Sequence, residues 1–120
     1  MERPKLSGAR RLVLAFQNSW KGFLGAWRAE AAFRQEILFA IILLPLGAWL
    51  GRTGVEKALL VGSVLIVLIV ELLNTGIETV VDRIGLERHE LSGLAKDVGS
   101  SAVLLSLTLW AVIWGFLLFG

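Results

Sequence analysis

The sequence predicts an all-α membrane protein, in which one amphipathic surface helix precedes three transmembrane helices in a single domain of 120 residues. Hydrophobic residues make up 56% of the chain and its mean hydropathy is +0.74, which is too apolar for an ordinary soluble domain. The chain also holds three long apolar runs, and a membrane-spanning helix needs about 20 apolar residues. A soluble helical bundle is the alternative fold, but the last run has no polar face to present to water.

The first predicted element is an amphipathic helix over about residues 7–32. Aromatic side chains recur there at three- and four-residue steps, while basic side chains occupy another face, as at Phe16, Trp20, Trp27, Lys21 and Arg28. This pattern suits a helix lying on the membrane surface, although packing against the bundle without lipid contact would produce the same pattern. Residues 1–6 are expected to form a loose tail.

Three transmembrane helices are predicted at about 33–51, 55–81 and 97–119. The first contains Pro45, and a glycine-containing turn separates it from the second. Basic residues concentrate before the first span, which predicts a cytoplasmic N-terminus. The chain has no cysteine, so disulfides, thiolate metal sites and thiol nucleophiles are excluded.

A row of polar side chains interrupts the second span. Glu71, Asn74, Glu78 and Asp82 fall on one face of a helix. If this helix enters the bilayer near Lys57, Glu71 lies about 21 Å into a hydrocarbon core ~30 Å thick, and Glu78 reaches the cytoplasmic boundary. An ionised group at depth costs roughly 2.5–3.5 kcal/mol, so we expect the row to have a function.

The residue types suggest phosphate chemistry, but they leave alternatives open. A carboxylate at the depth of Glu71 suits a general base for a lipid hydroxyl, and Glu78 with Glu30 offers oxygen ligands for Mg²⁺. Lys96 suits a phosphate, or else an anchor at the membrane boundary, and Glu30 could instead pair with Arg34. A small ion or proton transporter would carry a similar polar row, and a structural membrane subunit is a third class.

Four stretches resemble the prokaryotic integral-membrane diacylglycerol kinases: SWKG at 19–22, EAAFRQE at 30–36, VELLNTGIETVVDRIG at 70–85 and HELSGLAKDVGSSAV at 89–103. The resemblance implies a multi-pass protein of the bacterial inner membrane that transfers the γ-phosphate of Mg-ATP to the sn-3 hydroxyl of diacylglycerol, giving phosphatidic acid. It also implies a homotrimeric bundle with active sites shared between chains, in contact with membrane lipids and without a nucleic-acid partner. A three-span sister group phosphorylates undecaprenol, which is the alternative acceptor.

Carried over by motif, the resemblance implies that Glu71 is the catalytic base and that Glu30 and Glu78 hold the metal that accompanies ATP. The implied nucleotide-binding residues comprise those two carboxylates and Arg11, Asn18, Glu87, Arg88, His89, Lys96 and Asp97. The implied lipid-substrate residues comprise Glu71 and Arg11, Ser19, Trp20, Ala32, Phe33, Arg34, Trp49, Asn74, Ser100 and Trp114.

Overall fold

The computed structural model describes residues 7–120, which form four helices: α1 (Gly8–Ala29), α2 (Ala31–Leu50), α3 (Gly54–Ile84) and α4 (Glu90–Phe119). No strand occurs within residues 7–120, so the predicted all-α class is confirmed. Three of the helices, α2, α3 and α4, are long and apolar enough to cross a membrane. The tail expected at residues 1–6 lies outside the described residues.

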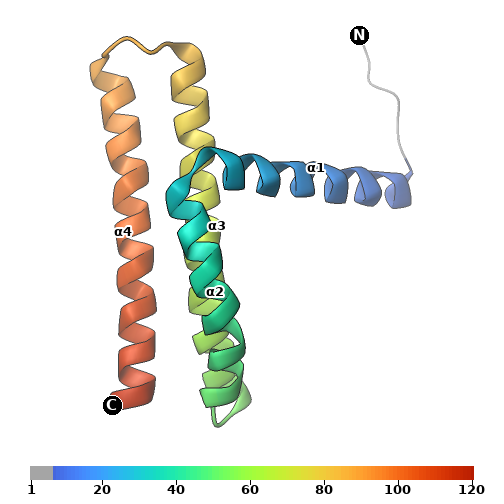
Figure 1. Cartoon of the computed structure of the whole chain (residues 1–120), viewed down its shortest axis with the longest axis vertical. Coiled ribbons are helices and arrows are strands. Elements are labelled where there is room, and N and C mark those ends of the chain that lie inside the picture. Colours follow the sequence, from blue (N-terminus) through green and yellow to red (C-terminus); the bar gives the residue numbers. More distant parts are fainter. Residues whose placement is uncertain (1–6) are drawn as a thin grey trace.

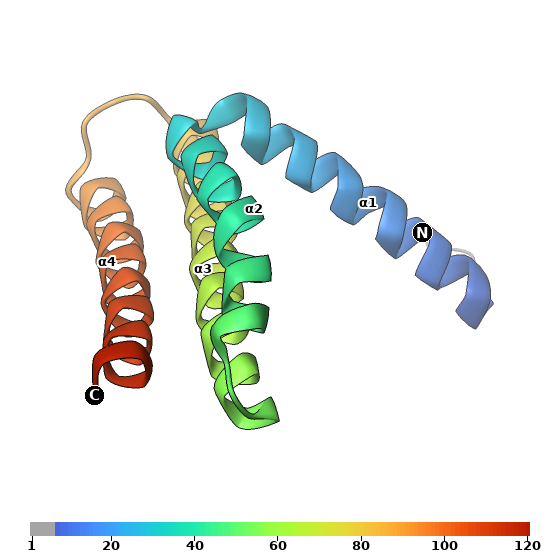
Figure 2. The same ribbon diagram turned by 60° about the horizontal axis from the view of Figure 1, so that its bottom comes forward.

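Helix α1 lies across the direction of the other three helices and projects away from them at its N-terminal end (Figures 1 and 2). Ser7 caps this end, because its Oγ accepts a hydrogen bond from the Arg10 backbone N–H at 3.3 Å. Phe16 and Trp20 are 79% and 65% exposed. An amphipathic helix held at this angle to three apolar helices fits the surface position that the sequence predicts.

A single residue, Glu30, separates α1 from α2, and its backbone is extended (φ −122°, ψ 115°). Arg34 fixes this corner by donating hydrogen bonds from Nη1 to the carbonyl oxygens of Trp27 at 2.7 Å and Arg28 at 3.3 Å. These carbonyls belong to the last turn of α1, where they have no partner within the helix. Arg34 therefore serves the helix end, and no Glu30–Arg34 ion pair forms among residues 7–120.

Helix α3 is central, because α2 and α4 each pack against it while α2 and α4 scarcely approach each other (Figures 1 and 2). A core forms toward the α2–α3 turn, where Trp114 lies against Leu60 and Val64. The Trp114 indole N–H donates to the Leu60 carbonyl oxygen and to Ser63 Oγ, both at 3.1 Å. Gly47 lets α2 lie close to α3 at this point, since a Cβ on Gly47 would be only 3.2 Å from Leu60 Cβ.

The outward faces of the three long helices are apolar. Ile41 on α2 and Leu104 and Leu105 on α4 are 63–69% exposed in a single chain. Lipid or a second copy of the chain would cover such surfaces. Helix α4 begins at Glu90, earlier than the predicted span at 97, because His89 caps it with Nδ1 accepting from the Leu91 backbone N–H at 3.1 Å.

Candidate active site

Glu71 lies inside the bundle on α3 and is 6% exposed. It follows Leu60 by 11 residues, which places it about 16 Å along α3 from the Trp114 core. The sequence predicted a carboxylate at membrane depth, and the structure places Glu71 away from the ends of a helix that can span the membrane.

Glu36 is the acidic neighbour that the sequence reasoning missed. It projects from α2, its carboxyl group interacts with that of Glu71, and its Oε2 is buried without a hydrogen-bond partner. Two neighbouring carboxyl groups repel each other when both are ionised. Glu36 lay within the predicted first span at 33–51 but was given no role, although an ionisable residue within an apolar helix is itself a signal of function.

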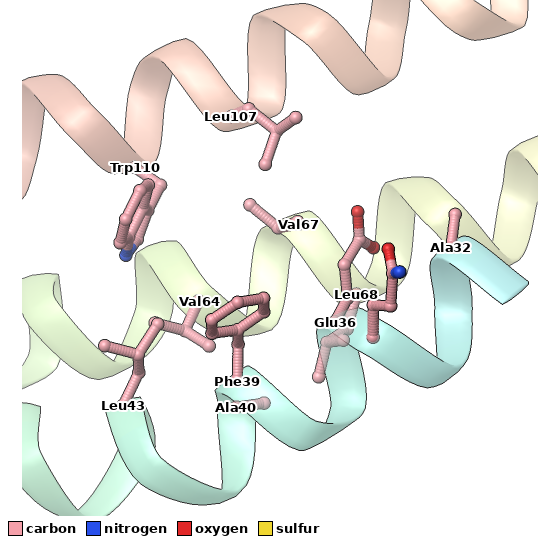
Figure 3. A pocket seen from close by; sticks show the side chains of 11 residues that line it. Ala32, Glu36, Phe39, Ala40, Leu43, Val64, Val67, Leu68, Leu107 and Trp110 are labelled. Atoms are coloured by element: carbon pink, nitrogen blue, oxygen red, sulfur yellow. The ribbon is translucent and has the colours of Figure 1, made fainter.

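An apolar cavity of about 350 Å³ lies between α2, α3 and α4, and Glu36 lines it (Figure 3). Its other walls are mainly aliphatic and aromatic, and they include Ala32, Phe39, Val67 and Trp110. Trp110 Nε1 is also buried without a partner among the described residues. The cavity can accommodate an apolar chain, and the Glu36 carboxyl group would lie at the cavity wall beside that chain.

Glu30 and Glu78 meet where the α1–α2 corner approaches α3. A hydrogen bond with the Glu78 carboxyl group raises the pKa of Glu30 above its ordinary value, and burial and the charges of Glu78 and Glu71 act in the same direction. Asn74 Nδ2 donates to Glu78 Oε1 at 3.1 Å. The structure thus brings together the two carboxylates that the sequence predicted as metal ligands.

This pair fits Mg²⁺, because mutual repulsion between two carboxylates is relieved by a divalent cation. No group of three or more His, Cys, Asp or Glu side chains within residues 7–120 has a metal-binding arrangement. Two carboxylates would suffice for Mg²⁺, since this ion is usually held by one or two of them together with water and substrate phosphates.

Lys96 is paired with the last acidic residue of the α3 row. Its Nζ lies 2.8 Å from Asp82 Oδ1, and both side chains are about half exposed. The pair joins α4 to α3 beyond Glu78. Asp97 and the loop residues Glu87 and Arg88 are exposed near this pair.

A second groove, of about 670 Å³, runs between α1 and α3. Ser19 and Phe23 line it from α1, and Thr75 and Thr79 line it from α3. Small residues of α1 make room for it, namely Gly22, Gly25, Ala26 and Ala29. Phe33 is 1% exposed and stacks at a ring-centroid distance of 6.4 Å from Phe23, so it supports this region from within.

Several predicted site residues do not reach Glu71 within one chain. Arg11 and Asn18 are exposed on α1, and the rise of a helix places Arg11 about 28 Å along it from Glu30. Trp49 is 78% exposed beside the α2–α3 turn, whereas Trp114 is buried there. Trp20 and Ser100 face outward.

The chain matches the sequence model of the family described as prokaryotic diacylglycerol kinase over residues 17–118. The chain belongs to the prokaryotic diacylglycerol kinase family. Three relatives named diacylglycerol kinase are similar over nearly their whole lengths. The protein of Haemophilus influenzae is 48% identical over 115 residues, which cover 96% of this chain and 98% of the relative.

The Pseudomonas aeruginosa diacylglycerol kinase is 46% identical over 114 residues, covering 95% of this chain and 93% of the relative. The Helicobacter pylori J99 diacylglycerol kinase is 40% identical over 112 residues, covering 93% and 88%. Membership of the diacylglycerol kinase family makes the chain an ATP-dependent lipid kinase, which confirms the predicted enzyme class. The three candidate membrane spans agree with a lipid substrate.

Proposed function

We propose that the chain phosphorylates the sn-3 hydroxyl of diacylglycerol, with Glu71 as the general base. The supporting observation is that Glu71 is a buried carboxylate on the same face of α3 as Glu78, which meets Glu30 nearer the end of the helix. A lipid hydroxyl beside Glu71 and a nucleotide beside Glu30 and Glu78 would approach each other along this face. This arrangement suits transfer between a lipid and a water-soluble donor.

In the proposed reaction, Glu71 accepts the proton of the sn-3 hydroxyl while the hydroxyl oxygen bonds to the γ-phosphorus of ATP. The bond between that phosphorus and the β–γ bridging oxygen breaks, which leaves ADP and phosphatidic acid. Phosphoryl transfer depends mainly on positioning and charge neutralisation. Glu30 and Glu78 would hold Mg²⁺, which neutralises phosphate charge, and Lys96 would exchange Asp82 for a phosphate oxygen.

The two hollows supply room for the acceptor lipid. The α1–α3 groove carries Ser19 and Thr75, whose hydroxyls can contact a glycerol headgroup, and the apolar cavity beside Glu36 can take an acyl chain. Undecaprenol also presents a terminal hydroxyl on an apolar chain. An assay in which diacylglycerol and undecaprenol compete would separate the two acceptors, and we expect phosphatidic acid to be the dominant product.

We further propose a homotrimer in the bacterial inner membrane, with a cytoplasmic N-terminus and active sites shared between chains. The exposed apolar faces of α2 and α4 support contact with other copies or with lipid. Arg11, Asn18 and Trp49 lie away from Glu71 of their own chain, which is consistent with their serving the site of a neighbour.

The test is the Glu71→Gln variant, which preserves shape and hydrogen-bonding capacity but cannot accept the proton. We expect a folded protein whose turnover of short-chain diacylglycerol falls roughly 100-fold or more, since a general base contributes about 10²–10⁴-fold. Glu56→Gln is the matched control, because Glu56 lies at the α2–α3 turn and pairs with Arg52. A Glu71→Gln turnover within tenfold of wild type would refute the role of Glu71 as base.

A further inference from the structure

Helix α4 contains three glycines, Gly93, Gly99 and Gly115, and of these Gly99 contacts another helix. It is buried, and a Cβ added to it would collide with Asn74 Oδ1 and would lie 3.3 Å from Asn74 Cγ. An added Cβ on Gly93 or Gly115, the neighbouring glycines of α4, would meet nothing within 4 Å. The atoms nearest to this added Cβ all belong to the Asn74 side chain, and its amide oxygen is the first of them.

The orientation of the Asn74 amide follows from its other contact. Its Nδ2 donates to Glu78 Oε1 at 3.1 Å, and only the NH₂ end of the amide can donate to a carboxylate. The oxygen then occupies the other branch of the planar amide group, which points toward Gly99 on α4. Oδ1 is buried there without a hydrogen-bond partner among residues 7–120, and it fits because Gly99 has no side chain.

We propose that Gly99 is a positioning residue for phosphoryl transfer, because its missing side chain lets Asn74 hold the Glu78 carboxylate. This inference rests on the proposed role of Glu78. The colliding group is the end of a flexible side chain and not backbone, so a methyl group at position 99 is accommodated when Asn74 turns away. The fold is retained and the hydrogen bond to Glu78 is lost.

Gly99→Ala and Gly115→Ala, made in the full chain in detergent micelles, separate this role from a structural one. Alanine favours a helix over glycine by about 1 kcal/mol, so both variants should melt at or above the wild-type temperature. Only Gly99→Ala should lose activity, by about tenfold or more in kcat/KM for Mg-ATP, as expected when a hydrogen bond to a charged group is removed. A melting temperature of Gly99→Ala well below that of Gly115→Ala would instead assign Gly99 to helix packing.

A spectroscopic readout reports on the contact without activity. Asn18 and Asn74 are the only asparagines of the chain, so selective ¹⁵N labelling of asparagine side chains gives two amide signals, and Asn74→Ala assigns them. Gly99→Ala should shift the Asn74 signal and leave the Asn18 signal in place, whereas Gly115→Ala should shift neither. An unshifted Asn74 signal in Gly99→Ala would overturn the proposal.

A double-mutant cycle completes the test. If Gly99 acts only through Asn74, then adding Gly99→Ala to Asn74→Ala should cause no further loss of kcat/KM, and independent, multiplying losses would overturn the proposal. The Mg²⁺ dependence of a Glu78→Gln variant tests the metal role separately. A failure of that role would leave the amide shift intact, so the two proposals fail in distinguishable ways.

Discussion

Replacing Trp114 with phenylalanine should weaken the packing of α4 on α3 near the α2–α3 turn. The Trp114 side chain is 8% exposed, and its N–H is shared between the Leu60 carbonyl oxygen and Ser63 Oγ, each at 3.1 Å. Phenylalanine keeps an aromatic ring in this site but removes the donor. The sequence resemblance assigned Trp114 to the lipid substrate, so the variant also distinguishes a binding role from a packing role.

The loss in free energy of unfolding for Trp114→Phe depends on which hydrogen bonds remain after the substitution. Ser63 Oγ donates to the Leu60 carbonyl at 3.0 Å, so neither partner of Trp114 is left without a hydrogen bond. The cost should therefore be small, about 0.6–1 kcal/mol, as for interhelical hydrogen bonds in membrane proteins. Trp114→Ala also removes most of the ring contacts with Leu60 and Trp110, and we expect a loss of up to about 3–5 kcal/mol.

The assay is reversible unfolding of the purified chain in mixed micelles, together with KM for a short-chain diacylglycerol. Trp49→Phe is the control for the unfolding measurement alone, because Trp49 lies at the same end of the bundle and is 78% exposed. The packing argument fails if Trp114→Phe and Trp114→Ala both unfold within about 0.5 kcal/mol of wild type, the range of ordinary surface substitutions. A raised KM at unchanged stability would instead support contact with lipid substrate.

Three further outcomes are expected. Gly51→Ala should lower the melting temperature, because its Cβ would lie 2.7 Å from the Lys57 backbone nitrogen, and an unchanged melting temperature would contradict this contact. Lys96→Met should raise KM for ATP and leave the melting temperature nearly unchanged, since the ion pair that it breaks is about half exposed. Equal losses in stability and activity would argue against a phosphate role. The pKa of Glu30 is raised, so the stability that its bound proton supplies is complete below its ordinary value of 4.5 and is lost as the pH rises through the raised value. Mg²⁺ competes with the proton on Glu30, so the rise in melting temperature caused by Mg²⁺ should be larger at neutral than at acidic pH. A rise that is independent of pH would contradict binding of Mg²⁺ at Glu30.

The helices and the place of Glu71 within a helix of spanning length could be predicted from sequence, because both follow from positions along one chain. Apolar periodicity marked α1, uncharged length marked α2 to α4, and residue counting placed Glu71 inside a span. The contact between Glu30 and Glu78 was anticipated only as a shared metal site. The helices and the position of Glu71 were predicted from local sequence, and the Glu30–Glu78 contact was predicted mainly from the family resemblance.

Contacts between helices could not be predicted in the same way. Periodicity defines a helix face but not the rotation of that face toward a neighbour, so the partners Glu36 for Glu71 and Asp82 for Lys96 went unrecognised. The fit of Asn74 against Gly99 depends on the separation of two helix axes, which no one-dimensional pattern contains.

Glu30 alone joins α1 to α2, so any tilt of α1 pivots at a residue that we propose as a metal ligand. The helix has 22 residues and is about 33 Å long, so a tilt of ~10° displaces its far end by about 6 Å while Glu30 hardly moves. Such a tilt would shift Arg11, which lies near the far end of α1, by several ångströms relative to the other three helices. Arg34 binds two carbonyl groups of the last turn of α1, so these hydrogen bonds limit the tilt at the Glu30 corner.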